Sequence, residues 1–147
     1  MRQQMRPAER AGPRRWGLVP AAVLVLALSG LAAGCSSSKP AYCTDASQLK
    51  TDVQNLGNVN INVHDLSSVD TAVSKVQADA GKFATDAKSA YPSQTTALKN
   101  SVSSLETAVK SAMSQPSVTT VAAVVSSVTQ VKAAADNVQS AVKGTCQ

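Results

Sequence analysis

Apolar residues recur at alternating steps of three and four along three long segments of the chain. The segments cover residues 66–90, 98–112 and 121–142. This spacing places the apolar residues on one face of an α-helix, and its seven-residue repeat is typical of helices that pack side by side. The apolar positions are Leu66, Val69, Val73, Val76, Ala80, Phe83, Ala87 and Ala90, then Leu98, Val102, Leu105, Val109 and Ala112, then Val121, Val124, Val128, Val131, Ala135, Val138 and Val142.

Polar breaks bound these segments and predict short turns between antiparallel helices. Ser67 or Ser68 is the expected N-cap of the first helix. The proline-containing segments Tyr91–Ser93 and Ser114–Ser117 are the expected turns before the second and third helices. Gly144 is expected to end the third helix, because glycine is common just after a helix C-terminus.

The third segment is rich in valine, whose branched side chain lowers helix propensity. A β-strand over residues 118–128 is therefore an open alternative there. We expect a helix that depends on packing for its stability.

A shorter pattern precedes the three segments and predicts a first helix followed by extended chain. Thr44 or Asp45 is the expected N-cap of this helix, and Gly57 is its expected end. Its apolar residues are Ala46, Leu49, Val53 and Leu56, and the alternating residues that follow are Val59, Ile61 and Val63 against Asn58, Asn60 and Asn62. The two-residue alternation predicts an extended segment with one buried face.

The residues before Cys35 have the three parts of an export signal. A basic segment with five arginines precedes an apolar run over residues 18–31, and small residues lead into Cys35. This run is shorter than the roughly 20 apolar residues that a membrane-spanning helix needs.

The end of the run, LAAGC over residues 31–35, resembles the lipobox of bacterial lipoproteins. The resemblance implies that a diacylglycerol is attached to the Cys35 thiol and that cleavage leaves Cys35 as the first residue. Ala32 stands where this class usually has leucine, a tolerated variant, and free secretion after cleavage is the alternative. We therefore expect a signal peptide (1–34), a lipidated serine-rich tether (35–42) and a folded domain (43–147), held on the extracytoplasmic face of the cell membrane.

The net charge of +5 does not indicate a nucleic-acid-binding protein. All five arginines and Glu9 precede Cys35, so nine lysines and eight acidic residues follow it, a balance of about +1. Because the expected mature chain has no arginine and no basic run, we expect no nucleic-acid partner.

With Cys35 lipidated, Cys43 and Cys146 are the remaining cysteines, one at each end of the expected domain. An oxidising compartment favours a disulfide between them. Two free thiols, or a metal site with these two ligands, are the alternatives.

These elements predict an all-α protein, a small antiparallel helical bundle of three long helices, a short first helix and an extended segment, closed by one disulfide. Three antiparallel helices alone would leave the two cysteines at opposite ends. The first helix and extended segment supply a fourth pass, which returns both cysteines to one end beside the Tyr91–Pro92 turn.

The candidate chemistry after Cys35 does not indicate an enzyme, a cofactor or a metal. His64 is the single histidine, and His64 with Asp65 is too few ligands for a zinc site. The eight acidic residues are scattered singly along this part of the chain, so we expect them on solvated faces. The three glycines of this part form no phosphate-binding loop.

We therefore predict a non-catalytic, membrane-anchored spacer or protein-docking module of the cell envelope. Its partners would be envelope proteins, and its candidate interaction residues are Asn62, His64, Asp65 and Gln115, at the end of the bundle away from the disulfide. The alternative function is a small carrier of an apolar ligand or lipid, since bundles bind ligands between helices.

Overall fold

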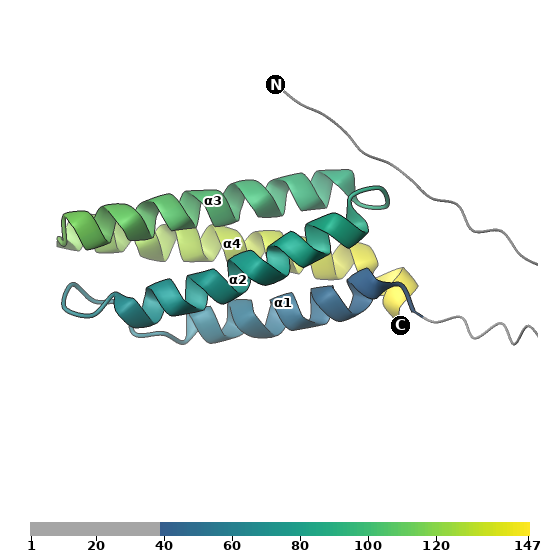
Figure 1. Ribbon diagram of the computed structural model, residues 1–147, viewed down its shortest axis with the longest axis horizontal. Coiled ribbons are helices and arrows are strands. Elements are labelled where there is room, and N and C mark those ends of the chain that lie inside the picture. Colours follow the sequence, from purple (N-terminus) through teal and green to yellow (C-terminus); the bar gives the residue numbers. More distant parts are fainter. Residues whose placement is uncertain (1–38) are drawn as a thin grey trace, which may run out of the picture. The chain divides into compact units, whose positions relative to one another are not determined.

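The computed structural model describes residues 39–147 as an antiparallel bundle of four helices (Figure 1). The helices are α1 (Ala41–Gly57), α2 (Ser67–Ala87), α3 (Pro92–Ser114) and α4 (Val118–Cys146). Each helix packs against the next, and α4 returns to pack against α1. The predicted all-α bundle is confirmed. The predicted signal peptide, Cys35 and residues 36–38 lie outside the described residues.

Helix α1 begins earlier than predicted. It starts at Ala41, directly after Pro40, so neither Thr44 nor Asp45 is its N-cap. The early start makes Cys43 part of the buried face that Ala46 and Leu49 continue. The residues predicted to end the tether are therefore the first turn of α1.

Residues 58–66, between α1 and α2, turn back on themselves and do not form one extended segment. The side-chain oxygen of Asn62 accepts hydrogen bonds from the backbone N–H groups of His64 (2.9 Å) and Asp65 (3.1 Å). An asparagine side chain replaces a backbone acceptor in this way and stabilises a turn. The predicted alternation holds for Val59 and Ile61, which pack in part against the core.

The N-cap of α2 is one or two residues earlier than the predicted Ser67 or Ser68. Leu66 occupies the cap position, and its side chain makes no capping hydrogen bond. The Asp65 carboxylate accepts hydrogen bonds from the Ser67 backbone N–H (3.1 Å) and hydroxyl (2.7 Å). These bonds lower the pKa of Asp65, because they stabilise its ionised form.

The other ends of the helices also differ from prediction. Helix α2 ends at Ala87, which leaves Ala90 exposed in the turn before Pro92. Helix α4 passes through Gly144 and reaches Cys146, whose disulfide holds the last turn in place. The alternative of a strand over residues 118–128 is wrong, because that segment is helical.

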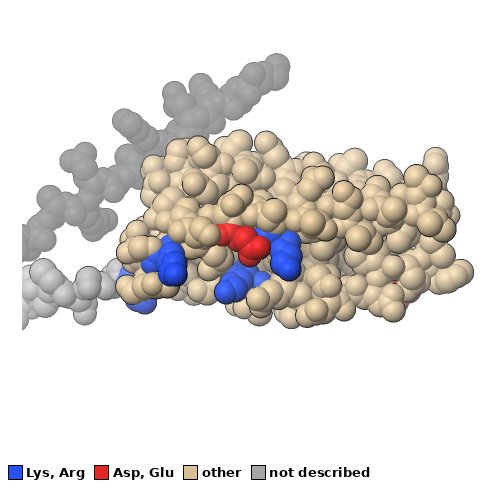
Figure 2. Space-filling view, turned by 180° about the vertical axis from the view of Figure 1, so that it is seen from behind, with Lys and Arg blue, Asp and Glu red and all other residues tan. Residues whose placement is uncertain are grey.

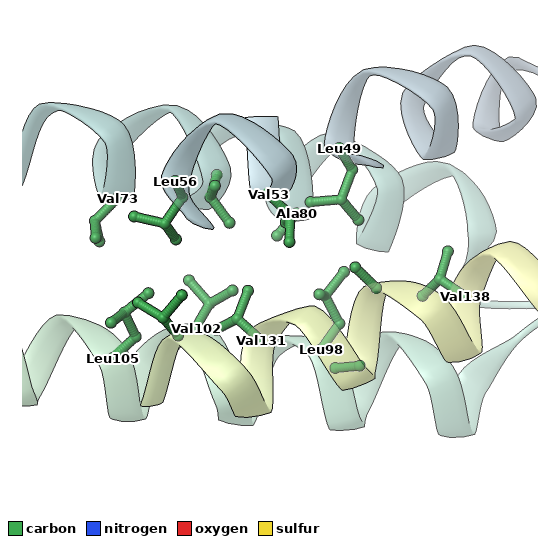
Figure 3. Close-up of a cluster of buried hydrophobic side chains, with 14 of the residues drawn as sticks. Leu49, Val53, Leu56, Val73, Ala80, Leu98, Val102, Leu105, Val131 and Val138 are labelled. Atoms are coloured by element: carbon green, nitrogen blue, oxygen red, sulfur yellow. The ribbon is translucent and has the colours of Figure 1, made fainter. Parts of the chain in front are cut away.

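The core consists of the predicted apolar faces of the four helices. Figure 3 shows side chains from α1 and α2 pointing toward those of α3 and α4. Most of these side chains are valine, alanine or leucine, and Phe83 is the largest that is fully buried. Ala84, Ala134, Thr95, Ser127 and Asp79 are also buried, and the regular spacing did not include them.

Replacing Ser117 by alanine is expected to destabilise the protein by about 1 kcal/mol. Ser117 is the N-cap of α4, and its hydroxyl accepts from the Thr120 N–H at 3.1 Å while the Thr120 hydroxyl accepts from the Ser117 N–H at 3.0 Å. Urea unfolding followed by circular dichroism measures the change. Ser117→Asp is the control, since aspartate also caps helices, and it should retain most of the stability.

Candidate functional site

One end of the bundle, called here the disulfide pole, holds the Cys43–Cys146 disulfide. The Cα atoms of the two cysteines are 5.4 Å apart and 103 positions separate them in sequence. The predicted pairing is confirmed, and the alternatives of free thiols or a two-ligand metal site are wrong. Because both cysteines lie in helices, the bond joins the first turn of α1 to the last turn of α4.

Two tyrosines pack beside the disulfide. The rings of Tyr42 and Tyr91 meet edge to face with their centroids 5.4 Å apart. The hydroxyl groups of Tyr91 and Thr145 share a hydrogen bond of 3.1 Å, which joins the α2–α3 turn to the end of α4. Desolvation, together with the neighbouring Tyr91, raises the pKa of Tyr42. The Tyr91 turn therefore lies at the disulfide pole, as predicted.

Lysine and glutamine side chains complete the disulfide pole. Lys39 donates to the backbone oxygen of Cys146 at 2.8 Å, and Gln139 donates to the backbone oxygen of Ala46. Both contacts join α1, or the residues before it, to α4. The first and last described residues are thus held at the same end of the bundle (Figure 1).

The other end, called here the opposite pole, carries the four predicted interaction residues. Asn62 and Asp65 use their side-chain oxygens to shape the loop, as described above. His64 is exposed. Gln115 is exposed and its backbone groups bond to Ser111 and Thr120. The role of these four residues in an interaction stays a prediction. His64 and Gln115 are the better candidates, because their side chains make no hydrogen bond within residues 39–147.

The opposite pole also carries apolar side chains that the sequence analysis did not single out. Among the described residues, the large hydrophobic side chains that are exposed are Met113 (51%), Val118 (81%) and Val125 (47%). Met113 lies in the last turn of α3, whereas Val118 and Val125 are seven residues apart on one face of α4. Their signal in the sequence is that they are apolar but outside the regular spacing of the buried face.

The stretch of chain that carries these side chains has no charged residue, and Lys110 and Lys132 bound it. No Asp, Glu, Lys, Arg or His occurs between Lys110 and Lys132. Figure 2 shows charged side chains near the disulfide pole, while the other half of that face is almost entirely without them. We call Val118, Ala122 and Val125 of α4 the apolar patch, since Ala122 is exposed and lies between the two valines on the same face. Met113 is not part of it, because it lies on the side of α3 that faces α2: Glu106, seven residues before it on the same face, bonds to Gln77 of α2.

Four of the acidic residues are brought together in pairs, which corrects the prediction that all are scattered on solvated faces. Asp45 and Asp52 on α1 face Asp86 and Asp79 on α2, respectively. Asp79 is 5% exposed, and Asp45 and Asp52 are half-buried. Nothing in the spacing along either helix alone indicates this pairing.

The surface hollows are shallow grooves between helices. The best-formed one, of about 390 Å³, lies between α1 and α4 and is lined by residues that include Lys50, Lys132, Asp136 and Val53. Charged and polar side chains thus line much of its wall. Over the described part of the chain, no three His, Cys, Asp or Glu residues are placed to hold a metal ion.

Comparison with protein-family models, curated proteins and solved structures finds no match for this chain. Helix α4 is long and apolar enough to cross a membrane by length and composition. That property alone does not assign a membrane span, because the core helix of a soluble bundle has the same character, and α4 packs against α1 and α3.

Proposed function

We propose that this protein is a lipid-anchored, extracytoplasmic docking module that binds a protein of the cell envelope and has no catalytic role. The lipobox resemblance at residues 31–35 supports the anchor. The apolar patch at the opposite pole supports the docking role.

The observation that carries the proposal is the placement of both ends of the described bundle, Lys39 and Gln147, at the disulfide pole. An anchor at Cys35 would be four residues before Lys39, a reach of at most about 14 Å. The disulfide pole would then stay near the membrane. The opposite pole would be free to meet another component of the envelope.

The character of the free surface favours a protein partner. The apolar patch and the uncharged residues 111–131 offer no cation for an anionic polymer or lipid headgroup. An exposed apolar patch rimmed by polar side chains is typical of an interaction site. The partner surface should therefore also be apolar and weakly charged.

Crosslinking in intact cells tests this proposal. We expect the tagged protein to crosslink to one envelope protein. We also expect Val118→Lys combined with Val125→Lys to reduce the yield about tenfold, because a charge would be buried in the contact. Ala97→Lys is the matched control, since Ala97 is exposed on α3 nearer the disulfide pole.

Three outcomes would contradict the proposal. The crosslinked species could contain only a second copy of this chain, or the double variant could crosslink as well as the wild type. A lipid bound in stoichiometric amount, found by mass spectrometry of the natively purified protein, would favour a carrier instead.

A further inference from the structure

The α1–α2 interface contains two pairs of aspartates in matched register. Asp45 and Asp52 are seven residues apart on α1, and Asp79 and Asp86 are seven apart on α2. The two helices run antiparallel and pack with Asp45 opposite Asp86, and the equal spacing then also brings Asp52 opposite Asp79. Like charges that face each other across an interface repel if both are ionised.

Two of these carboxyl groups have an oxygen that is buried and has no hydrogen-bond donor within residues 39–147. They are the Oδ2 atoms of Asp45 and Asp79. The side chain of Asp79 is only 7% exposed, so water does not replace the missing donor easily. A proton on one member of each pair would supply a donor, and the two carboxyl groups would then share a hydrogen bond.

The positive charges near the pairs compensate them only in part. Lys82 contacts Asp79 at 3.2 Å, but the lysine side chain is 65% exposed. Lys82 also acts on Asp45, and Lys75 acts on Asp52. Within the described bundle, the charged groups that act on the pKa values of Asp45, Asp52 and Asp79 all lie on α1 and α2, and none lies on α3 or α4. Two lysines are thus the positive charges that compensate the four aspartates.

We propose that the two aspartate pairs form a proton-dependent latch, which holds α1 against α2 when each pair carries one proton and weakens that contact when both members are ionised. The Cys43–Cys146 disulfide keeps α1 attached to α4 in either state. Loosening would therefore be confined to the α1–α2 side of the bundle.

The direction of the pH dependence follows from Asp45 and Asp79, the two members with a buried carboxyl oxygen. Desolvation and the facing carboxylate raise the pKa of Asp45 and of Asp79 above the ordinary 3.8. The folded protein therefore binds protons that the unfolded chain has already released, so their contribution to stability is lost as the pH rises above 3.8 through the raised pKa values. Asp52 has a lowered pKa, mainly through its hydrogen bond with Asp79, and its contribution is lost in the opposite direction, at lower pH.

Thermal unfolding of the full chain in mild detergent, followed by circular dichroism at pH 4.5 and pH 7.5, tests the latch. Asn is a neutral donor that resembles protonated aspartate, so Asp79→Asn should raise the Tm at pH 7.5 by on the order of 4 °C and change it little at pH 4.5. Asp52→Asn, which neutralises the same pair from α1, should give the same pH-dependent difference. Asp70→Asn is the matched control, an exposed aspartate on α2 that should show no such difference.

Hydrogen exchange provides the second measurement. In the wild type, amides of α1 and α2 should exchange faster at pH 7.5 than at pH 4.5 after correction for intrinsic rates, and both variants should remove this difference. Equal Tm changes at both pH values for both variants would overturn the latch. A rise in wild-type Tm with millimolar Ca²⁺ at pH 7.5 that Asp79→Asn abolishes would overturn it in favour of a cation site.

Discussion

Reduction of the Cys43–Cys146 disulfide is expected to lower the free energy of unfolding by about 4 kcal/mol. The bond spans 103 positions in sequence, so it removes much of the conformational freedom of the unfolded chain. A domain of this size typically has about 5–15 kcal/mol of stability in total. The bond therefore supplies a large share of the stability of this small, valine-rich and alanine-rich core.

Thermal melts with and without reductant measure this effect. In a Cys35→Ser background, which leaves only two cysteines, reduction should lower the Tm by about 15 °C. The Cys43→Ser, Cys146→Ser variant should melt at the temperature of the reduced protein and should not respond to reductant. A reduced protein that melts within about 3 °C of the oxidised form would show that tertiary packing alone holds the two ends together.

Replacement of Phe83 by alanine is expected to cost about 3–5 kcal/mol. Phe83 is fully buried and is the one phenylalanine in the chain. Its neighbours in the core are mainly valine, alanine and leucine, short side chains that cannot extend into the space left by the ring. The cost therefore includes the lost burial of the ring and the cavity that remains.

Two control variants separate the cost of the cavity from a general loss of stability on any substitution. Phe83→Leu retains most of the buried volume and should cost about 1.5 kcal/mol or less. Met113→Ala removes an exposed side chain and should change the stability by no more than about 0.5 kcal/mol. Urea unfolding measures all three variants, and equal costs for Phe83→Ala and Phe83→Leu would contradict the close packing inferred here.

The errors in the predicted helix ends have a common physical origin. The predicted helix end at Gly144 and the predicted helix start near Thr44 were based on helix-capping and helix-propensity preferences of about 1 kcal/mol. Tertiary contacts outweigh these preferences, because the disulfide at Cys146 and the burial of Cys43 both favour one more turn of helix. Residues 58–64 were predicted to be extended but contain a turn. The Asn62 side chain accepts a hydrogen bond from the backbone N–H of His64, which favours the turn over the extended form.

The candidate site was predicted only in part. The number of passes through the bundle identified the opposite pole as the end away from the disulfide. Asn62 and Asp65 were predicted to contact a partner, but their side-chain oxygens accept hydrogen bonds from the loop and from the start of α2. The apolar patch was not recognised. Apolar residues outside a regular face are common on surfaces, and only the exposure of Val118 and Val125 on one face of α4 makes them a candidate contact.

The amino-acid sequence by itself determined three long helices and a first helix, the residues of their buried faces and the pairing of Cys43 with Cys146. It did not determine that α1 alone makes the first pass of the bundle. The helices and their buried faces depend on spacing within one segment, and the cysteine pairing depends on the expectation that Cys35 is lipidated, which leaves only two cysteines. The tertiary structure alone decided which residues meet between helices: Asp45 with Asp86, and Asp52 with Asp79. That register depends on how far each helix slides along its neighbour, which the loops and the packed core set together and no single segment encodes.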